Sequence, residues 1–265
     1  MAEPDLKLLE AALREAGVLV RALRAKPLEV TSKGAAGPVT NIDFAVNELL
    51  AERLRSARPD YGWLSEESPD APDTRMSKAR TFMLDPIDGT QAMIDGAADF
   101  AISLGVVHGA TAHAGAIYLP MTDEMFLGAA GEGATLNGAA IRASTRAELE
   151  GAHIIGKRGF YKQIPWRTPW PETAFTAVQA IATRLAYIAA GRFDATILYG
   201  PKNEWDIAAG AAIIAAAGGR FTDARGAPIV FNNRTPKAPG AVAAGAQIHP
   251  LIIDRTKHFP HRIPD

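Results

Sequence analysis

The chain has 265 residues, 48% of them hydrophobic, and a formal net charge of −1. That length suffices for one large domain or two packed halves, and the charge leaves no basic footprint for a nucleic acid polymer. No cysteine is present, which excludes disulfide bonds and thiolate metal sites and fits a reducing cytoplasm. The acidic N-terminus lacks the layout of a signal peptide, and residues 207–219 are too few to span a bilayer. We therefore expect a soluble, cytoplasmic protein.

Two helices are predicted in the first sixty residues. The first has an apolar face of Leu6, Leu9, Leu13, Ala16 and Val20. A glycine-containing loop follows, and the second helix has an apolar face of Phe44, Ala45, Leu49, Leu50 and Leu54, with Asn41 or Thr40 as its N-cap. Residues 69–80 are polar and rich in turn formers, and we expect a mobile surface loop there.

Antiparallel strands dominate the next seventy residues. Residues 81–85 are predicted to form a buried strand that ends at Asp85, and residues 102–107 and 112–120 a hairpin that turns around residues 108–110. The pattern continues through residues 124–130 and 133–138. The charged stretch 144–151 is interpreted as a seam between an N-terminal α+β half, residues 1–146, and a C-terminal α/β half, residues 147–265.

The second half alternates strands and helices. Strands are predicted at residues 153–156, 193–200 and 220–223, and helices at residues 177–191 and 205–219, whereas the aromatic, proline-rich stretch 160–175 has no regular pattern. Strands followed by helices in both halves indicate layered sheets and helices, of the α/β or α+β class.

Carboxylates stand at or near the edges of several predicted elements: Asp43, Glu66, Glu67, Asp85, Asp88 and Asp206. Converging carboxylates repel one another, and their pKa values rise unless a positive charge lies between them. The usual solution is a hard divalent cation such as Mg²⁺, which prefers oxygen ligands and keeps some waters for a substrate phosphate.

The stretch LDPIDGT, residues 84–90, fits such a site best. Its proline fixes one backbone angle, so that Asp85, Asp88 and the Ile87 carbonyl can be held on one side of a tight turn. Gly89 and Thr90 then offer backbone N–H groups for a phosphate. An ordinary surface turn has the same composition, and Asp43 and Asp206 could equally cap their own helices.

Four motifs in order, VTNID, SEES, LDPIDGT and WDIAAGAAIIAAAGG, resemble those of the inositol monophosphatase superfamily of Mg²⁺-dependent, lithium-sensitive phosphatases. The resemblance covers residues 8–245. It implies a layered α-β-α-β-α sandwich of the α+β class, with the site between the halves, and a homodimer.

The resemblance also implies a role for each site residue. Glu66, Asp85 and the Ile87 carbonyl would hold one Mg²⁺, and Asp85, Asp88 and Asp206 a second, with a third, weaker ion often invoked. Glu67 would orient ligands and water. Thr90, hydrogen-bonded to Asp43, would polarise the attacking water, and the N–H groups of Gly89 and Thr90 would receive the phosphate, next to Asp88.

The substrate is predicted from the residues before the WDIAAG motif. Inositol monophosphatases have a glutamate there, whereas this chain offers Tyr199 or Leu198. The string YGPKNEWDIAAG instead resembles CysQ-type 3'(2'),5'-bisphosphate nucleotidases, which convert adenosine 3',5'-bisphosphate to AMP and phosphate. Lys202 would meet the second phosphate or be a solvated loop charge. We expect this activity first and that of an inositol-1-monophosphatase second; a fructose-1,6-bisphosphatase or a non-catalytic binding protein is less expected.

Other residues could bear on the substrate. The CysQ branch has a Gly-Ser-Ser-like element where this chain reads VQAIATRLA, and Arg184 in that stretch is interpreted as structural rather than as a phosphate contact. The aromatic residues Phe160, Tyr161, Trp166 and Trp170 fit a core or interface better than a base-stacking surface. The histidines lack metal-ligand spacing and are assigned surface or structural roles: His108, His113, His153, His249, His258 and His261.

Overall fold

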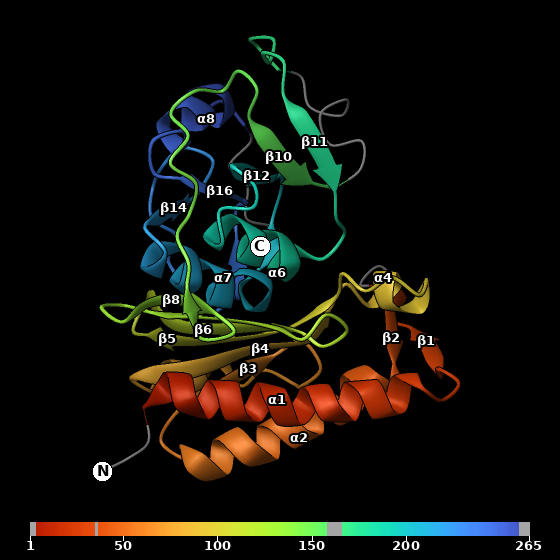
Figure 1. Ribbon diagram of the computed structural model, residues 1–265. Helices are drawn as coiled ribbons and strands as arrows, with labels where there is room; N and C mark the ends of the chain where they lie inside the picture. The colour runs from red at the N-terminus through yellow and green to blue at the C-terminus, as the bar shows by residue number, and fades with distance from the viewer. Residues whose placement is uncertain (1–3, 35–36, 158–165, 260–265) are drawn as a thin grey trace.

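The computed structural model describes residues 4–34, 37–157 and 166–259, and helices and sheets alternate in it as five layers (Figure 1). The outermost layer on one side is a pair of helices, α1 (Asp5–Arg24) and α2 (Asn41–Ala57). A large sheet separates them from the central helices α6 (Ile181–Ala189) and α7 (Glu204–Ala216). A second sheet follows, and α8 (His249–Thr256) covers its far face. This arrangement is the predicted α-β-α-β-α sandwich.

The large sheet contains seven strands in chain order, in which only the first pair is parallel. The strands are β3 (Gly62–Ser65), β4 (Arg80–Asp88), β5 (Ala101–His108), β6 (Thr111–Leu119), β7 (Glu124–Ala129), β8 (Gly133–Leu136) and β9 (Ala139–Ala140). The predicted hairpin is confirmed as β5–β6. All the strands come from the predicted N-terminal half.

The second sheet has the order β11-β10-β12-β16-β14 and mixes parallel and antiparallel pairs. Its strands are β10 (His153–Gly156), β11 (Ala174–Ala177), β12 (Ala195–Leu198), β14 (Gly219–Thr222) and β16 (Ala241–Gly245). Two short ladders accompany the sheets, β1 (Val30–Ser32) with β2 (Pro38–Thr40) and β13 (Lys202–Asn203) with β15 (Lys237–Ala238). The division at residue 146 stays a prediction.

A row of glycines lets α7 lie directly on the large sheet. Gly105, Gly115 and Gly128 pair across β5, β6 and β7, so they share one face of the sheet. A Cβ atom on Gly115 would lie 2.3 Å from the Ala209 carbonyl oxygen, and one on Gly128 would lie 2.8 Å from the Ile213 Cα atom. Side chains at these positions would push the alanine-rich α7 off the sheet, and α7 carries Asp206.

We expect Gly115→Ala to lower the free energy of unfolding by about 2–3 kcal/mol, because an added methyl group in a packed core forces the backbone apart. Urea denaturation of the variant and the wild-type protein measures this difference. Since the obstructing atom belongs to the α7 backbone, no change of side-chain rotamer can relieve the clash. Unchanged stability would mean that α7 does not approach the sheet this closely.

Two helix predictions need correction. The buried face of α2 consists of Ile42, Val46, Leu50 and Leu54, whereas Phe44 is 45% exposed. Leu50 and Leu54 were placed correctly, and steps of four from them lead to Val46 and Ile42. The helix predicted at residues 177–191 begins only at Ile181, because residues 174–177 form β11 beside β10.

Residues 69–80 lie mostly at the surface, as predicted, but a short helix and a buried arginine anchor the segment. Residues Pro72–Met76 form a short helix, α3, and the side chain of Arg75 is only 1% exposed. Arg75 donates to both oxygens of Asp70, at 2.9 and 2.8 Å, to Asn232 Oδ1 at 2.6 Å and to the Asn233 carbonyl at 3.0 Å. The segment therefore ties the two predicted halves together.

Candidate metal centre

A β-bulge brings the two aspartates of LDPIDGT to one face of β4. Asp85 pairs with Ser103 and Asp88 with Ala101, so β4 carries one residue more than β5 between these pairs. Residues three apart on a regular strand point to opposite faces, and the extra residue restores a common direction. Pro86, which has no N–H to donate, fits at a bulge. The strand therefore continues to Asp88, beyond the predicted end at Asp85.

Three carboxylates from distant parts of the chain converge here. Glu66 directly follows β3, Asp85 lies on β4, and Asp206 lies in the first turn of α7. Each offers an oxygen that lies within 4.8 Å of those of the other two. Among the described residues, these three form the acidic group with a geometry that could hold a metal ion.

The electrostatics of this acidic cluster indicate a cation site. Burial raises the pKa of Asp85 well above its usual value, and the charges of Glu66, Asp88 and Asp206 raise it further. Burial, Asp88 and Glu66 do the same for Asp206. Hard oxygen ligands with excess negative charge fit Mg²⁺, so the residues present are suited to the metal that the sequence predicts.

Asp88 lies beside the cluster and also bonds to α6. Its Oδ2 accepts a hydrogen bond from the backbone N–H of Ala182 in the first turn of that helix. Burial raises the pKa of Asp88 to about 6, although the N–H groups of Ala182 and Ile181 and the charge of Arg184 favour its ionised form.

Lys33 has no role in the sequence-based prediction, but its ammonium group lies between the carboxylates of Glu66 and Glu67. Its Nζ lies 2.8 Å from Glu66 Oε1 and 2.5 Å from Glu67 Oε1. Burial disfavours the charged lysine, but its bonds to Glu66 and Glu67 outweigh that effect and raise its pKa. The β1–β2 hairpin thus supplies a monovalent cation to the carboxylate that is proposed to bind metal.

We expect Lys33→Met to bind Mg²⁺ several-fold more tightly, because a divalent ion would no longer compete with an ammonium group for Glu66. Isothermal titration calorimetry measures the affinity. Lys26→Met removes a lysine outside this group of contacts and serves as the control. Weaker Mg²⁺ binding in Lys33→Met would instead show that Lys33 holds Glu66 in the metal-binding position.

Asp43 acts both at its own helix and at Thr90. Thr40, not Asn41, is the N-cap of α2, and its N–H and hydroxyl donate to Asp43 Oδ2 at 2.9 and 2.6 Å. Asp43 Oδ1 accepts from Thr90 Oγ1 at 3.0 Å, and the Ile87 carbonyl lies at the same distance from that hydroxyl. Asp43 therefore takes part in the cap of its own helix and also makes the contact with Thr90 that the family resemblance implies.

Gly89 provides the sharp turn between β4 and the short helix α4 (Thr90–Ile94). Its φ is +93°, a left-handed conformation that favours glycine. A Cβ atom there would lie 2.9 Å from the Cβ of Ala180, in the segment just before α6. The backbone of the turn is thus held close to the second half of the chain.

Asn47 fixes the loop that carries Glu66 and Glu67. Its Oδ1 accepts from Ser65 Oγ at 2.7 Å and from Ser68 Oγ at 3.2 Å, and its Nδ2 donates to the Glu67 carbonyl at 3.4 Å. Trp63 Nε1 also donates to Ser68 Oγ, at 3.3 Å. Asn47 lies four residues after Asp43 on α2, and this helical spacing was the available signal in the sequence.

Two basic residues of the predicted substrate side are bonded to backbone. Lys202 Nζ donates to the carbonyls of Tyr199, Gly200 and Pro201 at 2.8, 3.1 and 3.0 Å. An ammonium group has three N–H donors, so these bonds occupy all of them. Arg184 donates to the carbonyls of residues 179 and 180, which supports its structural interpretation.

The described aromatic residues and histidines lie in structural positions. Trp166 and Trp170 pack edge to face, 5.0 Å apart, against the core beneath α8, whereas Phe160 and Tyr161 lie outside the described residues. His153 contacts Thr176, and His249 contacts Thr222. His261 lies outside the described residues, and no described histidine belongs to the acidic cluster. Within the described part of the chain, no helix has the length and apolar character needed to cross a membrane.

Comparisons with known proteins agree with this fold and site. The profile described as "Inositol monophosphatase family" matches residues 1–259. The inositol-1-monophosphatase of Caulobacter vibrioides is 31% identical over 262 residues, covering 94% of this chain and 99% of its own. The Nus factor SuhB of Escherichia coli K12 is 32% identical over 235 residues, covering 84% and 86%.

Solved structures lead to the same family. An inositol monophosphatase (IMPase) structure from Thermotoga maritima superposes with a TM-score of 0.79 at 26% identity, covering 95% of each chain. The fold and the acidic cluster thus define a phosphomonoester hydrolase of the layered sandwich type. The chain belongs to the inositol monophosphatase family. The narrower likeness to CysQ-type nucleotidases has no counterpart among the relatives named here.

Proposed function

We propose that the protein is a Mg²⁺-dependent phosphomonoesterase whose main substrate is inositol 1-phosphate. The observation that carries the proposal is the convergence of Glu66, Asp85 and Asp206 in a buried cluster. Relatives named inositol-1-monophosphatase, such as that of Caulobacter vibrioides, favour this substrate over the bisphosphate nucleotide. The bonded state of Lys202, which has no donor left for a second phosphate, favours it as well.

The carboxylates would hold two Mg²⁺ ions. Glu66, Asp85 and the Ile87 carbonyl are assigned to one ion, and Asp85, Asp88 and Asp206 to the other. When bound, such ions neutralise the phosphate oxygens, acidify a water and stabilise the leaving alkoxide. Asp85 belongs to both sets, and because burial and the charges of Glu66, Asp88 and Asp206 raise its pKa, bound cations would be needed to keep it ionised.

Thr90 and the turn before it would handle water and phosphate. Because Thr40 fixes Oδ2 of Asp43, Oδ1 stays directed at the Thr90 hydroxyl, whose oxygen lone pairs can then orient a water. The left-handed turn at Gly89 would allow its own N–H and that of Thr90 to donate to the phosphate. Glu67 would help orient the ligands and the water. A homodimer and a cytoplasmic location remain predictions.

A substrate panel tests the proposal. Phosphate release is measured with Mg²⁺ on inositol 1-phosphate, adenosine 3',5'-bisphosphate and fructose 1,6-bisphosphate, and kcat/KM is compared. The highest value on inositol 1-phosphate supports the proposal, and the highest value on the bisphosphate nucleotide would restore the CysQ-type prediction. Absence of turnover on all three would instead favour a non-catalytic binding protein. Inhibition by Li⁺ is expected from the family resemblance.

A further inference from the structure

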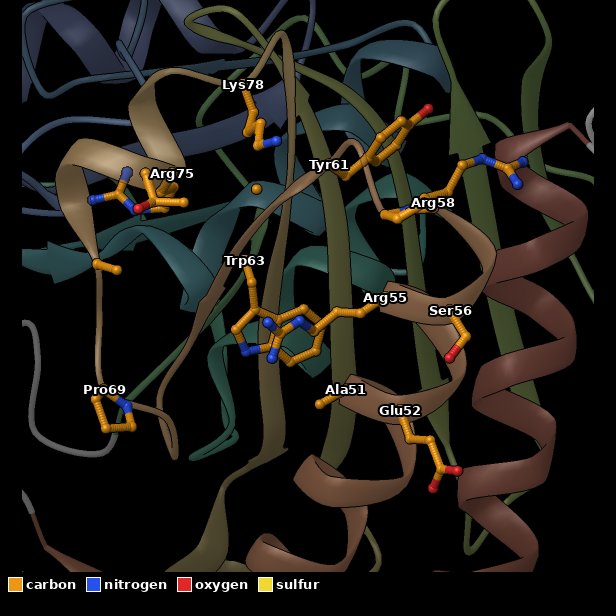
Figure 2. A pocket seen from close by; sticks show the side chains of 14 residues that line it. Ala51, Glu52, Arg55, Ser56, Arg58, Tyr61, Trp63, Pro69, Arg75 and Lys78 are labelled. Carbon is orange, nitrogen blue, oxygen red and sulfur yellow. The ribbon is translucent and has the colours of Figure 1, made fainter.

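A cavity of about 600 Å³ lies between α2, β3 and α3, outside the acidic cluster (Figure 2). Its lining comes from the C-terminal part of α2, from residues 58–63 and from the segment around α3. Glu66, Asp85, Asp206 and Thr90 do not belong to the lining. The volume lies in the range of sites that enclose a small metabolite.

The walls of this cavity combine an aromatic ring with apolar surface and cations. Trp63 is half-buried, and Pro59, Pro69 and Ala71 add apolar surface. Figure 2 shows Arg55 extending from α2 toward Trp63, and Lys78 entering from the turn after α3. Glu52 points away from Trp63 in the same view.

Arg55 and Lys78 are the cations of this cavity that remain available. Arg75 is bonded to Asp70, and Arg58 forms an ion pair with Asp5 at 3.5 Å. Within the described part of the chain, the side chains of Arg55 and Lys78 have neither a hydrogen bond nor an ion pair. Arg55 is exposed and Lys78 partly exposed, so both cations are accessible to an anionic ligand, and the indole of Trp63 is suited to a planar part of it.

We propose that this cavity is a second ligand site, which binds a nucleoside monophosphate. The base lies against the indole of Trp63, since an indole offers a large flat face to a planar ring. The phosphate lies between Arg55 and Lys78, where the guanidinium group can bond two phosphate oxygens. The lining of this site does not include the residues of the metal centre, and the proposal does not rest on the function proposed above.

A hydrogen-bonded path connects this cavity with the metal centre. Trp63 Nε1 donates to Ser68, Ser68 bonds to Asn47, and Asn47 donates to the Glu67 carbonyl. A base against Trp63 constrains the indole and, through Ser68 and Asn47, the loop of Glu66 and Glu67. Occupancy of the cavity therefore changes the affinity of the metal centre for Mg²⁺.

Calorimetry on the full chain in EDTA tests binding, because the uncompensated carboxylates of the metal-free centre repel phosphate. The probes are AMP, adenosine and inorganic phosphate. AMP is expected to bind more tightly than either fragment. Arg55→Gln combined with Lys78→Gln is expected to lower the affinity for AMP at least tenfold and to leave the affinity for adenosine nearly unchanged. Arg53→Gln, on the same helix but outside the lining, serves as the matched control.

Absence of AMP binding would overturn the site, as would equal affinity in the double variant. Coupling is tested by titrating Mg²⁺ with and without saturating AMP, where a change of threefold or more in affinity is expected. The double variant should lose this change, because AMP acting directly at the metal centre would not need Arg55 or Lys78. A change that persists in the double variant, or no change in the wild-type protein, would overturn the coupling.

Discussion

Asp85→Asn is expected to lower kcat/KM by at least about a thousandfold while the chain stays folded. Asp85 is the most central of the converging carboxylates, since its pKa is raised by Glu66, Asp88 and Asp206 as well as by burial. Metal ions contribute several kcal/mol to a phosphoryl transition state, and each 1.36 kcal/mol is about a factor of ten in rate. The amide keeps the shape and can still accept from the Ile87 N–H at 3.1 Å.

The stability of the same variant distinguishes a metal centre from a structural carboxylate. Removing one of several buried like charges relieves repulsion, so in EDTA the Tm of Asp85→Asn should equal or exceed that of the wild-type protein. Added Mg²⁺ should raise the wild-type Tm and leave the variant unchanged. Asp95→Asn, an exposed aspartate next to α4, is the control. Retained activity together with a retained Mg²⁺ shift would exclude the metal assignment.

The residues of the acidic cluster could be predicted from the sequence because each stands beside a local pattern. Asp85 ends a run of apolar residues, and Asp206 begins an alanine-rich helix; both features are visible in a short window. Their convergence was implied by the resemblance rather than by any single window. Layered sheets and helices were predictable for the same reason, whereas the order of the five layers was implied by the resemblance.

The partners of these residues could not be predicted, because they depend on backbone geometry and distant contacts. The bulge in β4 adds one residue between two pairs, and only strand pairing reveals it. Lys33 reaches Glu66 from 33 residues away, out of a loop whose composition suggests nothing beyond a turn. Arg75 was misjudged because a polar, proline-containing stretch is typical of a surface loop, whereas its partners lie about 160 residues further on.

Arg75→Ala is therefore expected to be the most destabilising of these substitutions, at about 3–5 kcal/mol, the range found when one partner of a buried ion pair is removed. Its loss leaves Asp70 without its bidentate partner and frees Asn232 and Asn233. These asparagines donate to Glu204, which is fully buried at the start of α7. Urea denaturation measures the difference. The free energy of unfolding of Arg75→Lys, which keeps the charge without the planar fork, should lie between those of the wild-type protein and Arg75→Ala.

Arg234→Ala is the matched control, because Arg234 and Asp73 join the same two segments at 2.6 Å but are 70% and 84% exposed. An exposed pair of this kind contributes at most about 1 kcal/mol. Glu204 lies two residues before Asp206, so Arg75→Ala should also weaken Mg²⁺ binding, whereas Arg234→Ala should not. Equal, small effects of the two substitutions would mean that residues 69–80 behave as the surface loop that their composition suggests, and that Asp206 is held by α7 alone.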